Sequence, residues 1–512
     1  MPPNKFKKTV AMVPLPMKNS SESFKIFKSP LSAQPSLGCG NMLTEKLFEA
    51  VGISSECLSG FSMYKKLDLY RFILQMIEIC GLKESHLDTP FEDDEISSQL
   101  LFKRSTMYER LGSGQIEWQT MSTFICVKIA LHLFKLRGCD IDDLYLVVDD
   151  TIIRRNRSKR LEFSAMIHDH NDNRFYRGFS LLTVGLTDGK IFVPLTFRLL
   201  ASQNTSKVFN YKPYKDDKSE SSRIRNDATS NRFEVLYSML EMLRDMGVSS
   251  STLLMDSWFG HPSVIQRLNI MGFETITMLK ASDTKFKRVF TGDNVTVKEL
   301  STELNDKLAR GEITRSSSPV VVPVLVEGKG KTVKGKIIMS RNWAKDSAKK
   351  KPFIAIFSSR MDLETNETLL NYLFRWQIET NFKFMKSYLY LQDGCEATKF
   401  NVCNAHVALV FMRNAVIVGA STMFFNNAAL SQVKEFFAKS LIYKTIAAES
   451  VLANNLAYEL IAYFAGIMPE KYVDLMSDML TAKRLELEKL CPHYLKMVRT
   501  MGLKINLLAD CE

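Results

Sequence analysis

Two short apolar runs, each ending in an aspartate, restrict the fold of this chain more than any other feature. LYLVVDD at 144–150 and STLLMDSWFG at 251–260 have the length and composition of buried strands. Strand ends are rigid mounts, so the acidic residues there are candidates for a site. A strand-terminal aspartate is also common in an ordinary turn, so neither residue decides the matter alone.

The segments around these runs predict an α/β fold. Apolar runs at 178–186 and 190–200 are joined by Thr187-Asp188-Gly189, and Asp-Gly between two such runs indicates a β-hairpin. Three further segments are predicted as helix, helix and strand, in that order: 232–246, 261–271 and 274–280. The resulting order of strands, hairpin and helices matches a sheet with mixed strand directions.

A third acidic residue lies in a stretch that is predicted to be one helix, 371–390. At about 100° per residue, Tyr372 and Lys386 lie about 20° from Glu379, and Arg375 lies about 40° from it. One helix face would then show a carboxylate, a guanidinium, an ammonium and a phenol. Taken alone, this face could equally be a solvated, salt-bridged surface.

Three carboxylates on rigid mounts suit metal-dependent cleavage of a phosphodiester. Two divalent ions about 3.5–4 Å apart can activate a water and stabilise the leaving oxygen. Mg²⁺ and similar hard cations prefer oxygen ligands. The candidates are Asp149 or its neighbour Asp150, together with Asp256 and Glu379.

The same motifs resemble the signature of IS4-type DDE transposases. The spacing Tyr-(2)-Arg-(3)-Glu-(6)-Lys at 372–386 meets the pattern without a gap, VVDDT resembles the first acidic motif, and MDSWF resembles the second. In the first motif an Asp precedes Thr or Ser by two positions, which selects Asp149 over Asp150. Segment 168–200 and a β-rich insertion before the glutamate are also similar, so the resemblance covers about 144–400.

This resemblance implies an RNase H-like core in which Asp149, Asp256 and Glu379 are catalytic and bind two Mg²⁺ ions, with Mn²⁺ as a possible substitute. It also implies that Tyr372, Arg375 and Lys386 contact double-stranded DNA at the transposon ends. In some members an aromatic side chain stacks on a flipped base. The candidates for that role here are Trp258, Trp343 and Trp376.

The charge balance of the chain fits a nucleic-acid partner. Its formal net charge is +12 and its pI is about 9.1, which suits a polyanion. Five cations occupy seven positions directly after the first acidic motif: Arg154, Arg155, Arg157, Lys159 and Arg160. They could hold a DNA backbone near the carboxylate, or they could simply form a solvated loop.

The chain is long enough for about three domains, and four regions are predicted. Residues 1–40 read as a basic disordered arm, and 41–138 as a helical DNA-binding domain whose segment 96–113 resembles a helix-turn-helix element. The DDE catalytic domain is predicted at 139–400, with 201–229 as a polar loop and 281–352 as a β-rich insertion. The remainder, 401–512, is predicted to be helical.

Several other classes are disfavoured by the sequence. The nine cysteines show no zinc spacing, which favours reduced thiols, and no signal peptide is predicted at the N-terminus. The most membrane-like stretch, 405–425, contains Arg413 and Asn414, so a buried core helix is the better interpretation. The expected location is therefore the cytoplasm of a prokaryote, in association with the nucleoid.

Together these features predict the DNA transposase of an insertion sequence. The protein would bind terminal inverted repeats and carry out cut-and-paste cleavage and strand transfer, acting on transposon ends and target DNA as a homodimer and without a membrane. One alternative is an RNase H-like nuclease without strand transfer. Another is a domesticated DNA-binding protein that has lost catalysis.

Overall fold

The computed structural model describes residues 39–434, apart from these gaps: 65–67, 80–86, 93–96, 98–99, 170–171, 213–218, 314–318, 329–330, 342–352 and 426. The chain divides into two compact units, 1–36 and 37–512, and every described residue belongs to the second. Trp343, nearly all of the predicted basic arm and everything after residue 434 in the predicted C-terminal region lie outside the described residues.

The first part of this unit is helical. Its α-helices are α1 (Cys39–Ala50), α2 (Ser55–Ser59), α3 (Leu69–Ile79), α5 (Arg104–Gly112) and α6 (Trp118–Leu136). Helix α5, the helical half of the predicted helix-turn-helix segment, buries Met107 and Leu111 and packs on a later helix, α13 (Phe400–Met423). Helix α6 packs on α13 as well and on a strand of the sheet, β4.

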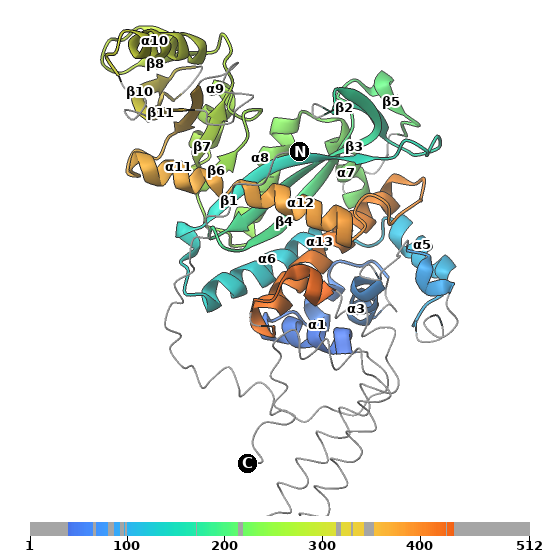
Figure 1. The fold of residues 1–512 in the computed structure, drawn as a ribbon. Coiled ribbons are helices and arrows are strands. Elements are labelled where there is room, and N and C mark those ends of the chain that lie inside the picture. Colours follow the sequence, from blue (N-terminus) through green and yellow to red (C-terminus); the bar gives the residue numbers. More distant parts are fainter. Residues whose placement is uncertain are drawn as a thin grey trace, which may run out of the picture. The chain divides into compact units, whose positions relative to one another are not determined.

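The described residues form one twelve-stranded mixed sheet (Figure 1). Its strands are β1 (Tyr145–Arg154), β2 (Ser164–Asp169), β3 (Arg174–Thr187), β4 (Phe192–Leu200), β5 (Val208–Phe209), β6 (Thr252–Met255), β7 (Glu274–Leu279), β8 (Lys285–Arg288), β9 (Asn294–Thr296), β10 (Val320–Val326), β11 (Val333–Arg341) and β12 (Phe353–Ser358). The order is β5-β2-β3-β1-β6-β7-β12-β11-β10-β8-β9, with β4 also paired to β3.

Strand β1 is the centre of the part that holds the acidic residues. It runs antiparallel to β3 and parallel to β6, which in turn runs parallel to β7. The expectation that this strand stops at the aspartates is wrong, because β1 continues to Arg154. Its parallel pairing with β6 nevertheless ends at Val148, so Asp149 lies where the neighbouring strand stops.

The predicted hairpin is present as β3 and β4, joined through Gly189, whose positive φ of 83° suits a residue without a side chain. The predicted polar loop at 201–229 contains an unexpected helix, α7 (Glu220–Thr229). Its polar sequence has no apolar period, and the helix is held by buried polar contacts such as Arg198 Nε to Asp227 Oδ2 at 2.8 Å. Helices α8 (Arg232–Asp245) and α9 (Pro262–Ile270) agree with the predicted segments.

The insertion continues the sheet beyond β12, since β12 pairs with both β7 and β11. It has its own small core, in which Phe286 and Phe357 stack with ring centroids 6.3 Å apart. It is not purely β, because α10 (Val297–Ala309) lies within it. Thr296 and Glu299 form a capping box at the start of that helix.

The stretch predicted as one helix at 371–390 is two helices, α11 (Thr365–Leu373) and α12 (Trp376–Tyr388). At the junction the amide of Arg375 bonds the carbonyl of Tyr372, and the amide of Ile378 bonds that of Arg375. These tight i to i−3 bonds interrupt the α-helical pattern without reversing the chain. Tyr372 and Glu379 therefore belong to different helices.

Helix α13 is the core helix of this unit. It is long and apolar enough to cross a membrane by length and composition, but its most apolar window is completely buried inside the structure. Its Phe411 packs on Phe197 of β4 with ring centroids 4.8 Å apart. The core helix of a soluble protein passes the same composition test. The buried position agrees with the core helix that the sequence predicted for this segment.

Candidate active site

Asp149 and Asp150 are neighbours in β1 and point to opposite faces of the sheet, because side chains alternate along a strand. On the Asp149 face lie α12 and α13. Arg375, at the N-terminus of α12, contacts Asp149, and α13 packs on Phe197, whose partner Thr183 lies opposite Asp149. On the Asp150 face lie α7 and α8.

Asp256 is the first residue after β6 and belongs to the Asp149 face. The parallel register pairs Val148 with Met255, so the next residue of each strand is Asp149 and Asp256. Neighbouring strands are about 4.8 Å apart. Two carboxylates distant in sequence are thus brought side by side by the pairing of β1 with β6.

Glu379 joins this pair through a guanidinium. Arg375 Nη1 donates to Asp149 Oδ2 at 2.9 Å, and Arg375 Nη2 donates to Glu379 Oε1 at 2.8 Å. The Arg375 side chain is only 7% exposed, against 32% for Glu379. The planar fork therefore connects the strand carboxylate to the helix carboxylate from a buried position.

Burial dominates the electrostatics of Asp149. Loss of water raises the pKa of its carboxyl to about 7, an effect that the Arg375 charge partly offsets and the nearby Asp150 and Asp256 charges reinforce. Burial lowers the pKa of Arg375, but the neighbouring Tyr372, Asp149, Asp256 and Glu379 outweigh it, and the net direction is upward. The guanidinium stays charged, while Asp149 is held near the point of protonation.

Polar atoms without partners surround Asp149. Arg375 Nε, the Tyr372 hydroxyl and Thr183 Oγ1 are buried and make no hydrogen bond of standard geometry within the described residues, although Tyr372 lies close to the Arg375 side chain. Such groups are costly to bury, so they indicate a place where a ligand or water completes the bonding. All three lie on or beside the Asp149 face.

Lys386 also reaches this face, as its predicted helix position requires. Its Nζ donates to Thr151 Oγ1 at 2.7 Å, two residues along β1 from Asp149. Burial lowers its pKa, and the Arg154 charge adds to that effect. The four residues of the Tyr-Arg-Glu-Lys pattern are therefore gathered along β1 despite the break between α11 and α12.

The Asp150 face is organised differently. Arg232 Nη1 of α8 pairs with Asp150 Oδ2 at 3.1 Å, and the Ser180 hydroxyl donates to the same oxygen. The Arg232 guanidinium also lies 5.8 Å from the Trp258 ring. Arg232 could not be identified from the sequence, because a basic residue at the start of an amphipathic helix does not indicate which acidic residue it pairs with.

Two tryptophans predicted to contact DNA are about half exposed. Trp258 has Lys280 Nζ 4.4 Å from its ring centroid, and Trp376 has Arg375 Cζ 5.5 Å from its own. Each half-exposed ring therefore lies beside a cation and close in sequence to one of the acidic residues. The third candidate, Trp343, is outside the described part of the chain.

The cations predicted after Asp149 differ in their burial and in their partners in the structure. Arg154 is paired with Asp169 at 2.7 Å and lies 3.8 Å from the Tyr176 ring centroid. Arg155 is half-buried, whereas Arg157 is exposed. Of these three, Arg157 is therefore the best placed for a partner outside the chain.

The carboxylates fit divalent ions in donor type. Asp149, Asp256 and Glu379 offer only oxygen, the ligand that Mg²⁺ prefers. Over the residues that the structure describes, no group of three or more acidic, histidine or cysteine residues is arranged to hold a metal ion. The guanidinium of Arg375 lies between Asp149 and Glu379, so it must shift before both can share an ion.

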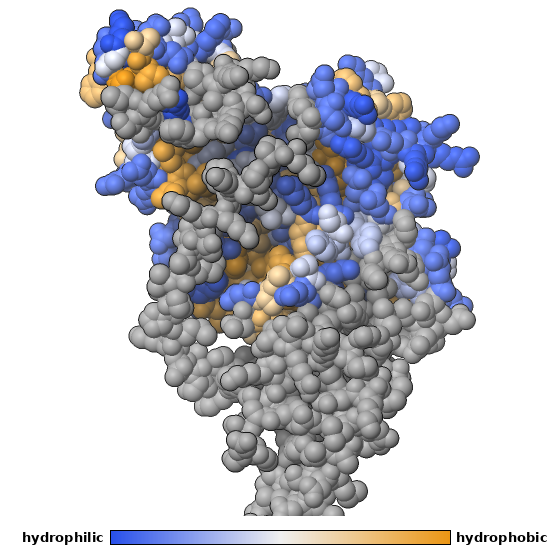
Figure 2. Space-filling view, in the orientation of Figure 1, coloured by the Kyte–Doolittle hydropathy of each residue, from blue (hydrophilic) through white to orange (hydrophobic). Residues whose placement is uncertain are grey.

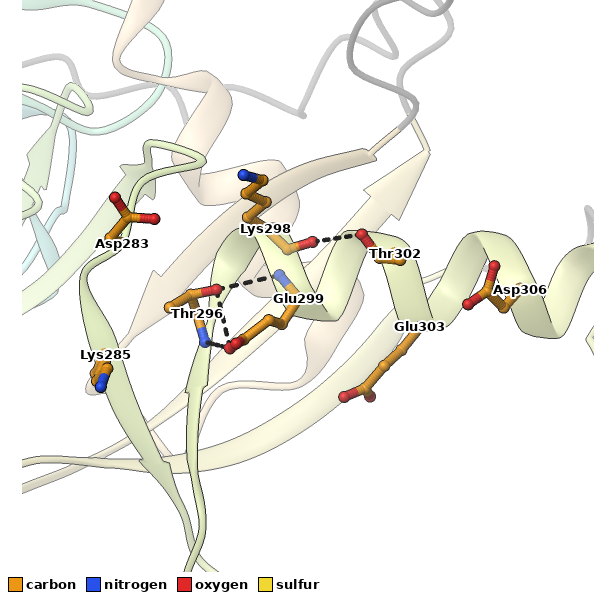
Figure 3. A pocket seen from close by; sticks show the side chains of 8 residues that line it. All are labelled: Asp283, Lys285, Thr296, Lys298, Glu299, Thr302, Glu303 and Asp306. Atoms are coloured by element: carbon orange, nitrogen blue, oxygen red, sulfur yellow. Dashed lines mark hydrogen bonds between the residues drawn. The ribbon is translucent and has the colours of Figure 1, made fainter.

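An open pocket on the insertion is separate from this set of residues. It is lined by acids, lysines and threonines of the β8 to α10 region (Figure 3). Two of its acids are already engaged: Glu299 caps α10, and Glu303 pairs with Arg288. None of its lining residues belongs to the predicted site.

Comparison with known proteins supports the class that this geometry indicates. A family model described as a DDE superfamily endonuclease matches residues 95–347. The matched region contains Asp149 and Asp256 and ends before Glu379. No curated protein matches the chain. The match supports a DDE-type endonuclease or transposase, with DNA as the substrate.

Proposed function

We propose that this protein is an IS4-type transposase that cuts and joins DNA at the ends of its own insertion sequence. The observation that carries the proposal is the convergence of Asp149, Asp256 and Glu379 on one face of the sheet around Arg375. A structural ion pair would not need a third carboxylate or leave buried polar atoms unpartnered. The family match supports the coarser endonuclease class.

The strand arrangement supports an RNase H-like core for this proposal. In the series β4-β3-β1-β6-β7, the first three strands are antiparallel neighbours, and the last two run parallel to β1. That is the arrangement of RNase H-like sheets. Two acidic residues then lie on adjacent strands, and the third is supplied by a helix that packs across them.

The proposed chemistry is cleavage of a phosphodiester by water, followed by attack of the freed end on target DNA. Two Mg²⁺ or Mn²⁺ ions bound by Asp149, Asp256 and Glu379 would activate the nucleophile and stabilise the leaving oxygen. Arg375 hydrogen-bonds Asp149 and Glu379 in the DNA-free protein. In the complex its planar fork is free to grip phosphate oxygens, with Tyr372 and Lys386 beside it.

DNA would be held by the basic surface around the site. Arg157, Trp258 and Trp376 are exposed, the two tryptophans lie within three residues of Asp256 and Glu379 in the sequence, and the chain carries a net charge of +12. We further propose a homodimer that pairs two transposon ends, acting in the cytoplasm of a prokaryote.

The test is a cleavage and joining assay with the purified chain. The probe is a duplex carrying the sequences that flank the gene, where a transposase requires short inverted repeats. We expect cutting at the repeat boundary with Mg²⁺ or Mn²⁺, little with Ca²⁺, none in EDTA, and joining of the cut end to a plasmid. Cutting without joining would indicate a nuclease, and binding without cutting a non-catalytic protein. Undiminished cutting in EDTA would refute the metal mechanism.

A further inference from the structure

An exposed group of aromatic and basic side chains lies at the far end of the β2–β3 hairpin, beyond β4. Phe175 is 63% exposed, Met166 49% and Phe209 40%. Among these strands such exposure is unusual, because β3 is fully buried from Gly178 onward. Figure 2 shows hydrophobic residues among hydrophilic ones at the end of the molecule where Figure 1 places β2, β3 and β5.

These side chains lie on one face of the sheet. The register pairs Met166 with Arg177 and His168 with Phe175, and each pair shares a face. Phe209 pairs with Ser164, two residues before Met166, and so belongs to the same face. We call this set, Met166, His168, Phe175, Arg177 and Phe209, the hairpin platform.

Cations and rings are already ordered against each other on the platform. Arg177 Cζ lies 4.1 Å above the Phe209 ring centroid, and its Nε donates to Ser164 Oγ at 2.9 Å. The rings of His168 and Phe175 lie with centroids 4.9 Å apart. Their planes are tilted by 54°, so each exposed ring, beside a fixed guanidinium, can stack a further planar group separately at little entropic cost.

The surroundings favour a polyanion. Between residues 154 and 177 the sequence holds seven lysines and arginines against three aspartates and glutamates. A second copy of the same surface would be repelled by this charge, whereas a nucleic-acid strand would be attracted. Aromatic rings with positive charge beside them are the usual means of binding unpaired bases.

The platform lies on the same face of the sheet as the carboxylates. Thr183, which is opposite Asp149, and Phe175 are eight residues apart on β3 and point the same way. At about 3.3 Å per residue the separation is about 26 Å, or roughly seven to eight base steps of DNA. One DNA molecule can therefore reach both places.

We infer that the hairpin platform is a stacking site for unpaired bases of a DNA strand that runs on from the active site. This inference rests on the proposed function and specifies its substrate as DNA with an unpaired flank. Phosphates next to these bases would lie beside Arg177. Fully paired duplex would not benefit, since its bases are stacked on one another.

The experiment compares three probes: the flanking-sequence duplex, the same duplex with about ten unpaired thymidines on either strand, and the thymidine strand alone. We expect the parent chain to bind the tailed duplex about tenfold tighter than the blunt one. Phe175→Ala should remove most of this difference and leave blunt-duplex binding unchanged. Phe290→Ala, in the turn after β8 where the ring is 86% exposed, is the matched control.

Each outcome decides the inference. If the parent and Phe175→Ala bind the tailed duplex equally well, the inference is overturned. It is also overturned if Phe175→Ala loses a dimer while DNA binding stays intact, because the platform would then be a contact between copies. If neither duplex binds but the thymidine strand binds the parent and not the variant, the platform stands and the proposed function falls. Arg177→Gln provides a second variant if Phe175→Ala proves unstable on heating.

Discussion

The two neighbouring aspartates of β1 point to opposite faces of the sheet and differ in their partners. Asp150 has a complete ion pair, with Arg232 and the Ser180 hydroxyl both bonded to one carboxylate oxygen. Asp149, one residue away, shares Arg375 with Glu379, lies beside Asp256, and has a pKa raised to about 7 by burial. Within the part of the chain that the structure describes, Thr183 Oγ1 and Arg375 Nε lie beside Asp149 without a hydrogen bond. The same side chain is thus structural on one face and suited to bind a ligand on the other.

The largest expected effect is on DNA cleavage, and it tests directly whether the two aspartates of β1 have different roles. Asp149→Asn should lower DNA cleavage on the order of 1,000-fold, about 4 kcal/mol in activation free energy, because a metal-binding charge is lost while the shape is kept. Asp150→Asn should retain cleavage within about tenfold. Both are measured with the flanking-sequence duplex in Mg²⁺.

The control for that pair is binding of the same duplex in EDTA, which both variants should retain. Asp256→Asn and Glu379→Gln should behave as Asp149→Asn does. If Asp150→Asn is inactive and Asp149→Asn cleaves normally, the two faces have been assigned the wrong way round.

A second effect concerns the arginine on each face. Arg375→Lys keeps the charge but cannot bond two oxygens in one plane, so we expect loss of the end complex or misplaced cleavage, on the order of 100-fold in rate. Arg232→Lys should cost only a few-fold, since its carboxylate is not in the site. Gel-shift and cleavage measurements on both variants check this. An Arg375→Lys protein equal to the parent in both would leave Arg375 as a mere partner of Glu379.

How much of this could be read from the sequence depends on how local the cause is. The hairpin, α8, α9 and the strand before Asp256 follow from short-range patterns, and the structure has them. The length of β1 did not follow, because its continuation depends on pairing with β3 rather than on its own composition. The break between α11 and α12 has no glycine or proline to signal it.

The site shows the same division. The motif spacing pointed to Asp149, Asp256, Glu379 and Arg375 as a group, and the structure gathers them. It could not show that Arg375 lies between two carboxylates, because that contact joins residues 226 positions apart. Arg232 and the hairpin platform were missed, since their character comes from cross-strand and helix-to-strand neighbours.

A third prediction uses the pH dependence of stability without metal. The Asp149 pKa is raised from 3.8 to about 7 in the folded chain, so the folded state holds its proton more tightly than the unfolded state. Stability from this group is complete below about pH 4 and declines as pH rises towards 7. Asp149→Asn avoids the decline, so its melting temperature should exceed the parent's by a few degrees at pH 8 in EDTA.

The excess should shrink as pH is lowered to 5, where Asp149 in the parent is protonated. Asp150→Asn is the matched control on the other face of β1; it removes the ion pair with Arg232, so we expect it to lower the melting temperature at pH 5 and at pH 8. A constant difference between parent and Asp149→Asn from pH 5 to 8 would show that burial does not govern this carboxyl.

The smallest effect asks whether the Asp149 face is built for stability or for a ligand. Burial raises the pKa of Tyr372 to about 12, so its hydroxyl keeps its proton; the Arg375 side chain lies close enough to act on it, but the hydroxyl makes no hydrogen bond of standard geometry within the described residues. An unsatisfied buried hydroxyl costs about 1–3 kcal/mol. Tyr372→Phe should therefore stabilise the DNA-free protein by about 1 kcal/mol while weakening the end complex by up to about tenfold. Tyr237→Phe, on α8 at the other face and similarly buried, should weaken DNA binding not at all. Denaturant titration and gel shift on the two variants make the comparison.

A Tyr372→Phe protein that loses stability and binds DNA normally would mean that the hydroxyl is already bonded in the folded chain. The Asp149 face would then be as complete as the Asp150 face.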